Sequence, residues 1–355
     1  MTNPDFEFNK KTGRRAMIAL LVVLIGAFFV FAFRMYVKYV SLSEIGAQYV
    51  GVFFTNLTVK LTAHIASFLL IFALFFVSTA AVDRISRPID GIMSKWLKNI
   101  WVKIALSVIL SVFASAYVSE TIYETYLLFS NSKEFGILDP FFGKDVGYYI
   151  FTRPFLASLV NSVLSVQLVV TIYCLALYAI NFSVNETMDL RCLAKDKATV
   201  IHNIVNVVIY FTLKAFTYKF KSQEILYSEF AGVSGAGYTD IYVWFNFYKI
   251  APYLLLAIVA LSIVFLSMQK YKPMIMTVAI YPVTLVAVSL VSLYVQKFVV
   301  DPNEFTKEKP YLSYNLEFTK QAFNINDVIT AEFSADNNLT AQDIADNKEV
   351  LNNVR

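Results

Sequence analysis

Two aspartates in an aromatic-rich stretch are the first candidates for chemistry. Asp139 and Asp145 lie among turn-forming residues: Pro140, Gly143 and Gly147. Carboxylates assisted by backbone carbonyl oxygens are ligands that hard divalent cations prefer. However, the spacing differs from that of the twelve-residue calcium loop, and aspartates beside proline and glycine commonly accept hydrogen bonds from turn amides. The sequence therefore favours a rigid turn held by these carboxylates, with a cation site as the alternative.

The aromatic residues that follow indicate a membrane boundary. Tyr149 comes shortly after Asp145 and leads into a long apolar block that begins at Pro154. Amphipathic aromatic side chains such as tyrosine are enriched at the membrane–water interface. We therefore expect the segment 119–153 to form a loop against one face of a membrane.

Two later stretches also combine a carboxylate with turn formers. Gly237, Tyr238 and Asp240 precede an apolar block, in a setting with too few glycines for a dinucleotide or phosphate loop. Asn303 and Glu304 follow a proline, which is typical of a solvated turn. Non-helical backbone near a membrane needs local partners for its amides and carbonyls. We expect all three stretches to pack into one cap on the outer side of the membrane.

Signatures of enzymes are missing from the sequence. The two histidines do not have the spacing of zinc ligands, and no G-x-S-x-G motif occurs. The sequence therefore favours a non-enzymatic protein, and no catalytic residue, metal or cofactor is assigned. An integral-membrane enzyme is the third alternative, and its catalytic residues would have to lie outside this stretch of chain.

Long apolar blocks must hold these stretches in place. About 20 residues of helix cross the roughly 30 Å of hydrocarbon in a bilayer. Hydrophobic residues make up 57% of the chain and charged residues only 16%. The predicted fold class is an all-α integral membrane protein with a seven-helix transmembrane bundle over residues 16–296. Its predicted helices are 16–33, 61–82, 100–119, 154–181, 198–213, 250–268 and 273–296.

Polar residues inside the blocks bear on passage through the bundle. The blocks contain no Asp or Glu, and Lys103 lies near a block end, where its side chain can reach the interface. The block 198–213 is short and polar enough that a surface-lying helix is its alternative. Three polar side chains lie centrally in the fourth block, and we expect them to form hydrogen bonds between helices. They are Asn161, Gln167 and Thr171.

Basic residues indicate the orientation, because Lys and Arg accumulate in cytoplasmic loops. The segments assigned to the cytoplasm contain 14 Lys and Arg in 57 residues: 1–15, 82–103, 182–197 and 269–272. The outer segments contain 10 in 98 residues: 34–60, 119–153 and 214–249. We therefore expect a cytoplasmic basic N-terminus, a C-terminus outside and seven spans, since omission of the fifth would invert everything after it.

The last part of the chain differs in character. Residues 297–355 are polar and contain ten of the 26 Asp and Glu residues. Thr340 and Asp343 have the spacing of a capping box, which predicts a helix running toward Val354. This segment is too short and polar to bury a core of its own. We expect it to be the beginning of a truncated extracytoplasmic domain.

The outer motifs together resemble uncharacterised protein family 0182, a family of large multi-pass bacterial membrane proteins. The motifs are Asp139-Pro140-x-Phe142-Gly143-x-Asp145-x-Gly147-x-Tyr149-x-Phe151-x-x-Pro154-Phe155, Gly235-Ala236-Gly237-Tyr238-Thr239-Asp240, and Pro302-Asn303-Glu304 with Glu308-x-Pro310-Tyr311, Asn315 and Thr319. Tyr148 and Phe323 depart from the family's usual Phe and Tyr. The resemblance implies seven N-terminal helices followed by a large extracytoplasmic domain, and it implies no assigned activity.

Two classes of function fit these observations. The first is a non-enzymatic protein of the bacterial cytoplasmic membrane, whose platform supports an outer domain that binds or passes lipid or polymer components. The alternative is a transporter or channel with a path through the bundle. The expected partners are the bilayer and lipids or envelope polymers, and self-association is left open. A net charge of +4 is too small to indicate nucleic-acid binding.

Overall fold

The protein folds into long helices that lie side by side. The structure is a computed structural model. It describes residues 10–86, 96–183, 196–230, 233–268, 270–328 and 340–352. The long helices are α1 (Lys10–Ile45), α2 (Val50–Ser86), α4 (Ile100–Ser130), α5 (Arg153–Ser183), α6 (Lys197–Glu224), α7 (Asn246–Ser267), α8 (Tyr271–Val295) and α9 (Glu304–Ala322).

Shorter elements connect and follow these helices. Two-residue strands β1 (Glu229–Phe230) and β2 (Val233–Ser234) pair antiparallel. The short helices α10 (Ala341–Asp346) and α11 (Lys348–Asn352) come last. Three π-helical segments adjoin the long helices, at Tyr148–Thr152, Asp240–Phe245 and Gln296–Val300.

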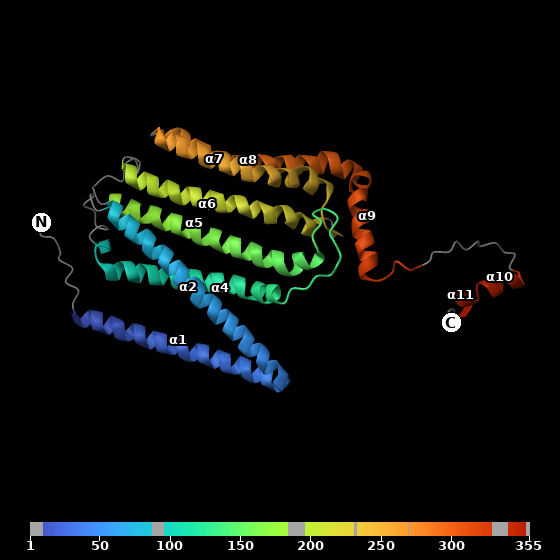
Figure 1. Ribbon diagram of the computed structural model, residues 1–355, viewed down its shortest axis with the longest axis horizontal. Helices are drawn as coiled ribbons and strands as arrows, with labels where there is room; N and C mark the ends of the chain where they lie inside the picture. The colour runs from blue at the N-terminus through green and yellow to red at the C-terminus, as the bar shows by residue number, and fades with distance from the viewer. Residues whose placement is uncertain are drawn as a thin grey trace.

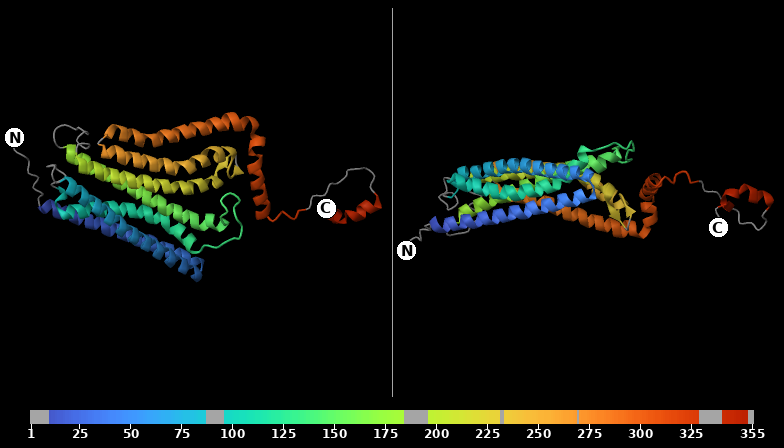
Figure 2. Two further views of the ribbon diagram at one scale, coloured as in Figure 1. Left: turned by 45° about the horizontal axis from the view of Figure 1, so that its top comes forward. Right: turned by 90° about the horizontal axis from the view of Figure 1, so that it is seen from below.

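The helices form a bundle in which neighbours in sequence pack together. Helix α2 contacts α4 and α5, and the contacts continue from α5 to α6, α6 to α7 and α7 to α8. Helix α1 meets α2 near the turn that connects them and diverges from it toward the N-terminus, while α9 runs across the end where α8 stops (Figure 1). The two further views in Figure 2 show the same arrangement of neighbouring helices.

Within the described residues, six helical segments are long and apolar enough to cross a membrane. They are Ala47–Ser86, Ile100–Ser130, Tyr148–Asn181, Lys197–Tyr227, Asp240–Phe265 and Lys272–Ala322. Each overlaps one of the predicted blocks after the first, and the predicted block 16–33 lies inside α1. The all-helical membrane class is therefore supported, while seven spans and their orientation stay predictions. The helices extend beyond the blocks because hydropathy marks the hydrocarbon alone, whereas helical backbone continues into the headgroup region.

Large apolar side chains cover the outside of the bundle as well as its inside. One buried cluster lies among α2, α4 and α5 and includes Phe75 and Tyr178, both fully buried. On the outer surface, Leu70, Phe113 and Met276 are 73%, 73% and 71% exposed. Exposed apolar area on this scale is unfavourable in water and favourable against lipid. The surface therefore suits a bilayer.

Lys103 behaves differently from the sequence expectation. Its Nζ donates to Asp83 Oδ2 at 2.7 Å, and the two residues are 9% and 1% exposed. The side chain therefore turns inward to an ion pair between α2 and α4 instead of reaching the interface. The expectation was wrong because Asp83 lies just beyond the apolar block 61–82. An opposite charge within reach makes burial of the ammonium group far less unfavourable.

The predicted capping box in the last segment is confirmed. The Asp343 amide donates to Thr340 Oγ1 at 3.2 Å, and the Thr340 amide donates to Asp343 Oδ2 at 2.8 Å. The helix that follows is shorter than predicted, because α10 ends at Asp346 and α11 starts at Lys348. Val354, the predicted end, lies outside the described residues.

Candidate functional site

The loop between α4 and α5 folds around the carboxylate of Asp139. Its oxygens accept hydrogen bonds from the amides of Phe141 and Phe142, at 2.8 and 2.9 Å. The hydroxyl of Tyr149 donates a third bond at 2.9 Å. Asp139 is 9% exposed, and Pro140 is exposed at the start of the turn. The carboxylate therefore ties the turn to the first residues of the next helix.

The second aspartate of this loop, Asp145, also serves backbone amides. It accepts from Phe135 at 3.1 Å, from Gly136 at 2.8 Å and from Gly147 at 2.6 Å. These amides, that of Phe135 most strongly, hold the pKa of Asp145 below its usual value, against a smaller opposing effect of desolvation. A backbone conformation with φ of +64° at Gly143 closes the turn, where a residue with a side chain would be strained.

Gly147 is required for a different reason. A Cβ atom at this position would lie 2.1 Å from the carbonyl oxygen of Lys133. The backbone of Gly147 therefore approaches the other side of the loop more closely than a side chain would permit.

The second motif turns around Asp240, at the start of the helix that leads into α7. Asp240 Oδ2 accepts from the hydroxyl of Ser228 at 2.7 Å and from the amide of Gly237 at 3.2 Å. Gly235 approaches α9, since a Cβ there would lie 2.8 Å from the side chain of Asn315. The second motif is therefore packed directly against the third.

Glu308 on α9 makes the main polar contact between these two motifs. Both of its carboxylate oxygens lie 3.1 Å from the amide of Tyr238, which donates to them. Glu308 is 8% exposed. The predicted residues Asn303 and Glu304 are instead exposed at the beginning of α9. Sequence reasoning therefore singled out Glu304 and missed Glu308, the carboxylate that contacts the second motif, although the family pattern Glu308-x-Pro310-Tyr311 contained it.

Side chains at the end of α8 complete the contact. Thr239 donates through its hydroxyl to Gln296 Oε1 at 2.6 Å, and Gln296 Nε2 donates to Asp301 Oδ1 at 2.9 Å. The indole of Trp244 donates to Ser292 Oγ at 3.0 Å. These bonds connect the second motif to α8 as well as to α9.

Aromatic rings join the first motif to the second. The rings of Phe141 and Phe142 meet the ring of Phe245 edge to face, at centroid distances of 5.1 and 5.8 Å. Tyr149 meets Tyr227 at 6.2 Å. The three motifs are therefore in contact, and the prediction that they pack together is confirmed. We call this assembly, residues 133–149, 223–230, 233–245 and 292–315, the cap.

The cap contains a small, partly open cavity of about 210 Å³ between the second and third motifs. Its lining includes two carboxylates, Asp240 and Glu308, with the hydroxyl of Thr239 and the amide of Gln296. Among the described residues, no group of three or more His, Cys, Asp or Glu side chains lies close enough to hold a metal ion. The carboxylates already accept protein hydrogen bonds. The arrangement therefore fixes backbone segments of the second and third motifs.

Some polar side chains in the bundle interior form hydrogen bonds between helices. Gln167 Nε2 donates to the carbonyl oxygen and to Oδ1 of Asn206, both at 3.3 Å, and so links α5 to α6. The interhelical bond predicted for Gln167 is confirmed. Thr171 instead donates within α5, to the Gln167 carbonyl at 2.8 Å, and Asn161 is exposed. His202 contacts the hydroxyl of Tyr178 at 2.8 Å.

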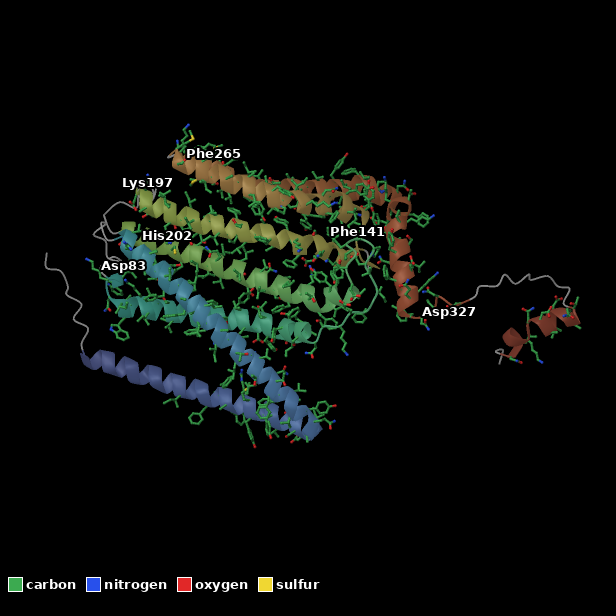
Figure 3. The ribbon with its side chains drawn as sticks, viewed as in Figure 1. Asp83, Phe141, Lys197, His202, Phe265 and Asp327 are labelled. Carbon is green, nitrogen blue, oxygen red and sulfur yellow. The ribbon has the colours of Figure 1, made fainter. Side chains whose placement is uncertain are left out.

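The cap and the polar ends of α2 and α6 lie at opposite ends of the bundle. Phe141 lies at one end, and Asp83, Lys197 and His202 lie at the other (Figure 3).

Comparison with known proteins identifies relatives along almost the whole chain. Residues 15–355 match the model of an uncharacterised protein family (UPF0182). A UPF0182 protein of Caldicellulosiruptor saccharolyticus is 35% identical over 350 residues, which are 98% of this chain and 38% of that protein. A relative in Clostridium perfringens is 29% identical and one in Clostridium tetani 34%, covering 88% and 71% of this chain and 35% and 30% of theirs. The chain spans about a third of the length of these curated relatives. No solved structure matches.

Proposed function

The chain belongs to the uncharacterised protein family UPF0182, and on that premise we propose that it forms a non-enzymatic membrane platform of the bacterial envelope. In this proposal α1, α2 and the helices from α4 to α8 cross the cytoplasmic membrane, with the N-terminus inside. The chain after α8 continues into an extracytoplasmic domain. That domain binds or passes lipid or polymer components.

The fixation of α9 by the cap is the observation that carries the proposal. Where α8 ends, the chain turns and α9 crosses the end of the bundle (Figure 1). Glu308 binds the Tyr238 amide, and Gln296 binds Thr239. The turn between α8 and α9 is therefore held on one side through Gln296 and on the other through Glu308, and this fixes the direction of α9. The cap is therefore suited to orient whatever follows α9 relative to the membrane.

The distribution of basic residues supports the proposed orientation. The ends of α2, α5 and α7, and the beginnings of α4, α6 and α8, gather at the end opposite the cap (Figure 3). The connecting segments there have more than twice the density of Lys and Arg found in the outer segments. Because Lys and Arg are retained in the cytoplasm, the cap is assigned to the outside.

The pairing of polar side chains in the interior favours this platform over a transporter. Gln167 is the central polar residue of α5, and its amide is engaged with Asn206 of α6. Hydrogen bonds of this kind hold membrane helices together. The pair therefore supports helix association, whereas a substrate path would need these groups to be available to the substrate.

Cysteine accessibility in intact cells tests the proposal. The full-length protein, with Cys174 and Cys192 replaced by serine, receives either Glu304→Cys or Lys270→Cys. A membrane-impermeant maleimide should label position 304 in intact cells and position 270 only after the membrane is permeabilised. Labelling of position 270 but not of position 304 in intact cells would overturn the proposed orientation. It would also overturn the proposal that the domain after α9 lies outside the membrane.

A further inference from the structure

A cavity between α1, α2 and α4 has both apolar and charged walls. Its volume is about 350 Å³. Phe53 and Leu57 contribute apolar surface, and three basic side chains lie on the same lining: Lys38, Lys60 and His64. A pocket with these two kinds of wall fits an amphiphilic ligand, which has a charged and an apolar part.

The charge of this cavity is unbalanced. Lys60 forms an ion pair with Glu120, and its Nζ lies 4.9 Å from the centroid of the Tyr123 ring. Glu120 is the one carboxylate among the lining residues that the structure describes, whereas Lys38 adds a second ammonium group. Ammonium groups at the membrane boundary attract the charged groups of anionic lipids. An anionic ligand therefore fits the cavity.

A second, almost wholly apolar cavity adjoins the first. It lies among α2, α4 and α5 and has a volume of about 370 Å³. Ser119 lines both cavities, and its hydroxyl lies 3.3 Å from His64 Nδ1. Leu70 and Val163, which contribute to its walls, are 73% and 47% exposed on the bundle surface. A hydrocarbon chain could therefore enter this cavity from the surrounding bilayer.

One polar group in the apolar cavity is left without a partner. Ser162 lines the cavity and is 2% exposed, yet within the described part of the chain its hydroxyl has no hydrogen-bond partner. A buried hydroxyl without a partner is unfavourable. A ligand that brings one oxygen atom into otherwise apolar surroundings, such as the ester oxygen of a lipid, would satisfy it.

We propose that these adjacent cavities form a binding site for an anionic phospholipid. Lys38, Lys60 and His64 contact its phosphate headgroup, and one acyl chain occupies the apolar cavity beside Ser162. The inference rests on the proposed placement of the bundle in a membrane and is independent of the role of the outer domain. It names the lipid class that the platform holds.

Lipid binding to the purified full-length protein tests the site. Native mass spectrometry would count bound lipids in detergent, and thermal unfolding would be followed with phosphatidylglycerol or phosphatidylcholine added. We expect the protein to retain phosphatidylglycerol and its Tm to rise when this lipid is added. Phosphatidylcholine should produce neither effect. Each Lys near an anionic lipid contributes about 1 kcal/mol, so Lys38→Gln with Lys60→Gln should weaken binding roughly thirty-fold. The exposed pair Lys133→Gln with Lys144→Gln has the same charge change and should leave binding unaltered.

Glu120→Gln separates headgroup binding from a merely structural ion pair. If Lys60 acted only through Glu120, then Glu120→Gln and Lys60→Gln would reduce lipid retention equally, which would overturn the proposal. We expect Glu120→Gln instead to bind phosphatidylglycerol as tightly as the unaltered protein or more tightly, because it removes the one opposing charge. Both variants would first be checked for insertion by the cysteine-labelling experiment, so that loss of the platform itself is recognised.

The apolar cavity is tested through chain length. Ala66→Phe places a ring in the cavity, and Ser162→Leu removes the hydroxyl. Ala66→Phe should weaken binding of long-chain phosphatidylglycerol about ten-fold and leave binding of its dihexanoyl form unchanged. Ser162→Leu should weaken binding of both forms, because both carry the ester oxygens. Equal Tm shifts with phosphatidylglycerol and phosphatidylcholine would overturn the headgroup assignment. An equal shift with inorganic phosphate would overturn the assignment to a lipid.

Discussion

Replacement of Asp139 is expected to destabilise the cap strongly. Its three shortest hydrogen bonds come from two backbone amides at 2.8 and 2.9 Å and the Tyr149 hydroxyl at 2.9 Å, with the Lys144 amide farther away at 3.4 Å, and the residue is 9% exposed. Each buried group that loses its partner costs about 1–3 kcal/mol. Because the three bonds form one network, their energies do not simply add. We therefore expect Asp139→Ala to lower the free energy of unfolding by about 3–5 kcal/mol.

Graded variants separate the parts of this network. Tyr149→Phe removes one hydrogen bond and should cost about 1 kcal/mol, whereas Asp139→Asn keeps one acceptor oxygen and should fall between the two. Glu304→Ala removes an exposed carboxylate and serves as the matched control, with a change within about 0.5 kcal/mol. In a double-mutant cycle, Asp139→Ala and Tyr149→Phe should couple by about the energy of their shared bond.

Thermal unfolding of the purified protein in detergent is the assay. Asp139→Ala should lower Tm by roughly 5–10 °C and reduce the folded yield. Purely additive effects of Asp139→Ala and Tyr149→Phe would refute the network. An unchanged Tm for Asp139→Ala, together with a Tm of the unaltered protein that rises with Ca²⁺ or Mg²⁺, would refute the structural role and favour a cation site.

Three further predictions concern single positions. The pKa of Asp145 is lower in the folded protein than its value of about 3.9 in the unfolded chain. The Asp145 carboxylate therefore stabilises the fold above that unfolded pKa, and this stabilisation is lost as the pH falls through the folded pKa. Asp145→Asn should accordingly make Tm less dependent on pH in the acid range. Gly147→Ala should abolish folded yield because its Cβ would lie 2.1 Å from a backbone carbonyl, whereas Gly51→Ala, with open space around it, should fold normally in the same expression test. Lys103→Met breaks the buried ion pair with Asp83 and should lower the free energy of unfolding by about 3–5 kcal/mol, with partial recovery in Lys103→Met/Asp83→Asn; equal stabilities of the single and double variants would contradict this.

The turn chemistry of the first motif was accessible from the sequence, because it is local. Asp139 bonds to residues two and three positions later, and Gly143 adopts the left-handed conformation that the turn requires. Such contacts depend on a few neighbouring dihedral angles, so residue types within a short window predict them. The bond from Tyr149, by contrast, depends on how the turn meets the following helix.

The sequence alone also determined the helices and the family, because partition into hydrocarbon is a property of each segment by itself. The block 154–181, for example, predicts a helix wherever its neighbours lie, and α5 contains it. Only the tertiary structure selected Glu308 over Glu304 as the carboxylate of the cap. Its partner Tyr238 lies 70 residues away, so the contact depends on the direction in which α9 leaves α8. The same holds for the ion pair of Lys103 with Asp83, since the crossing of two helices decides which charges meet.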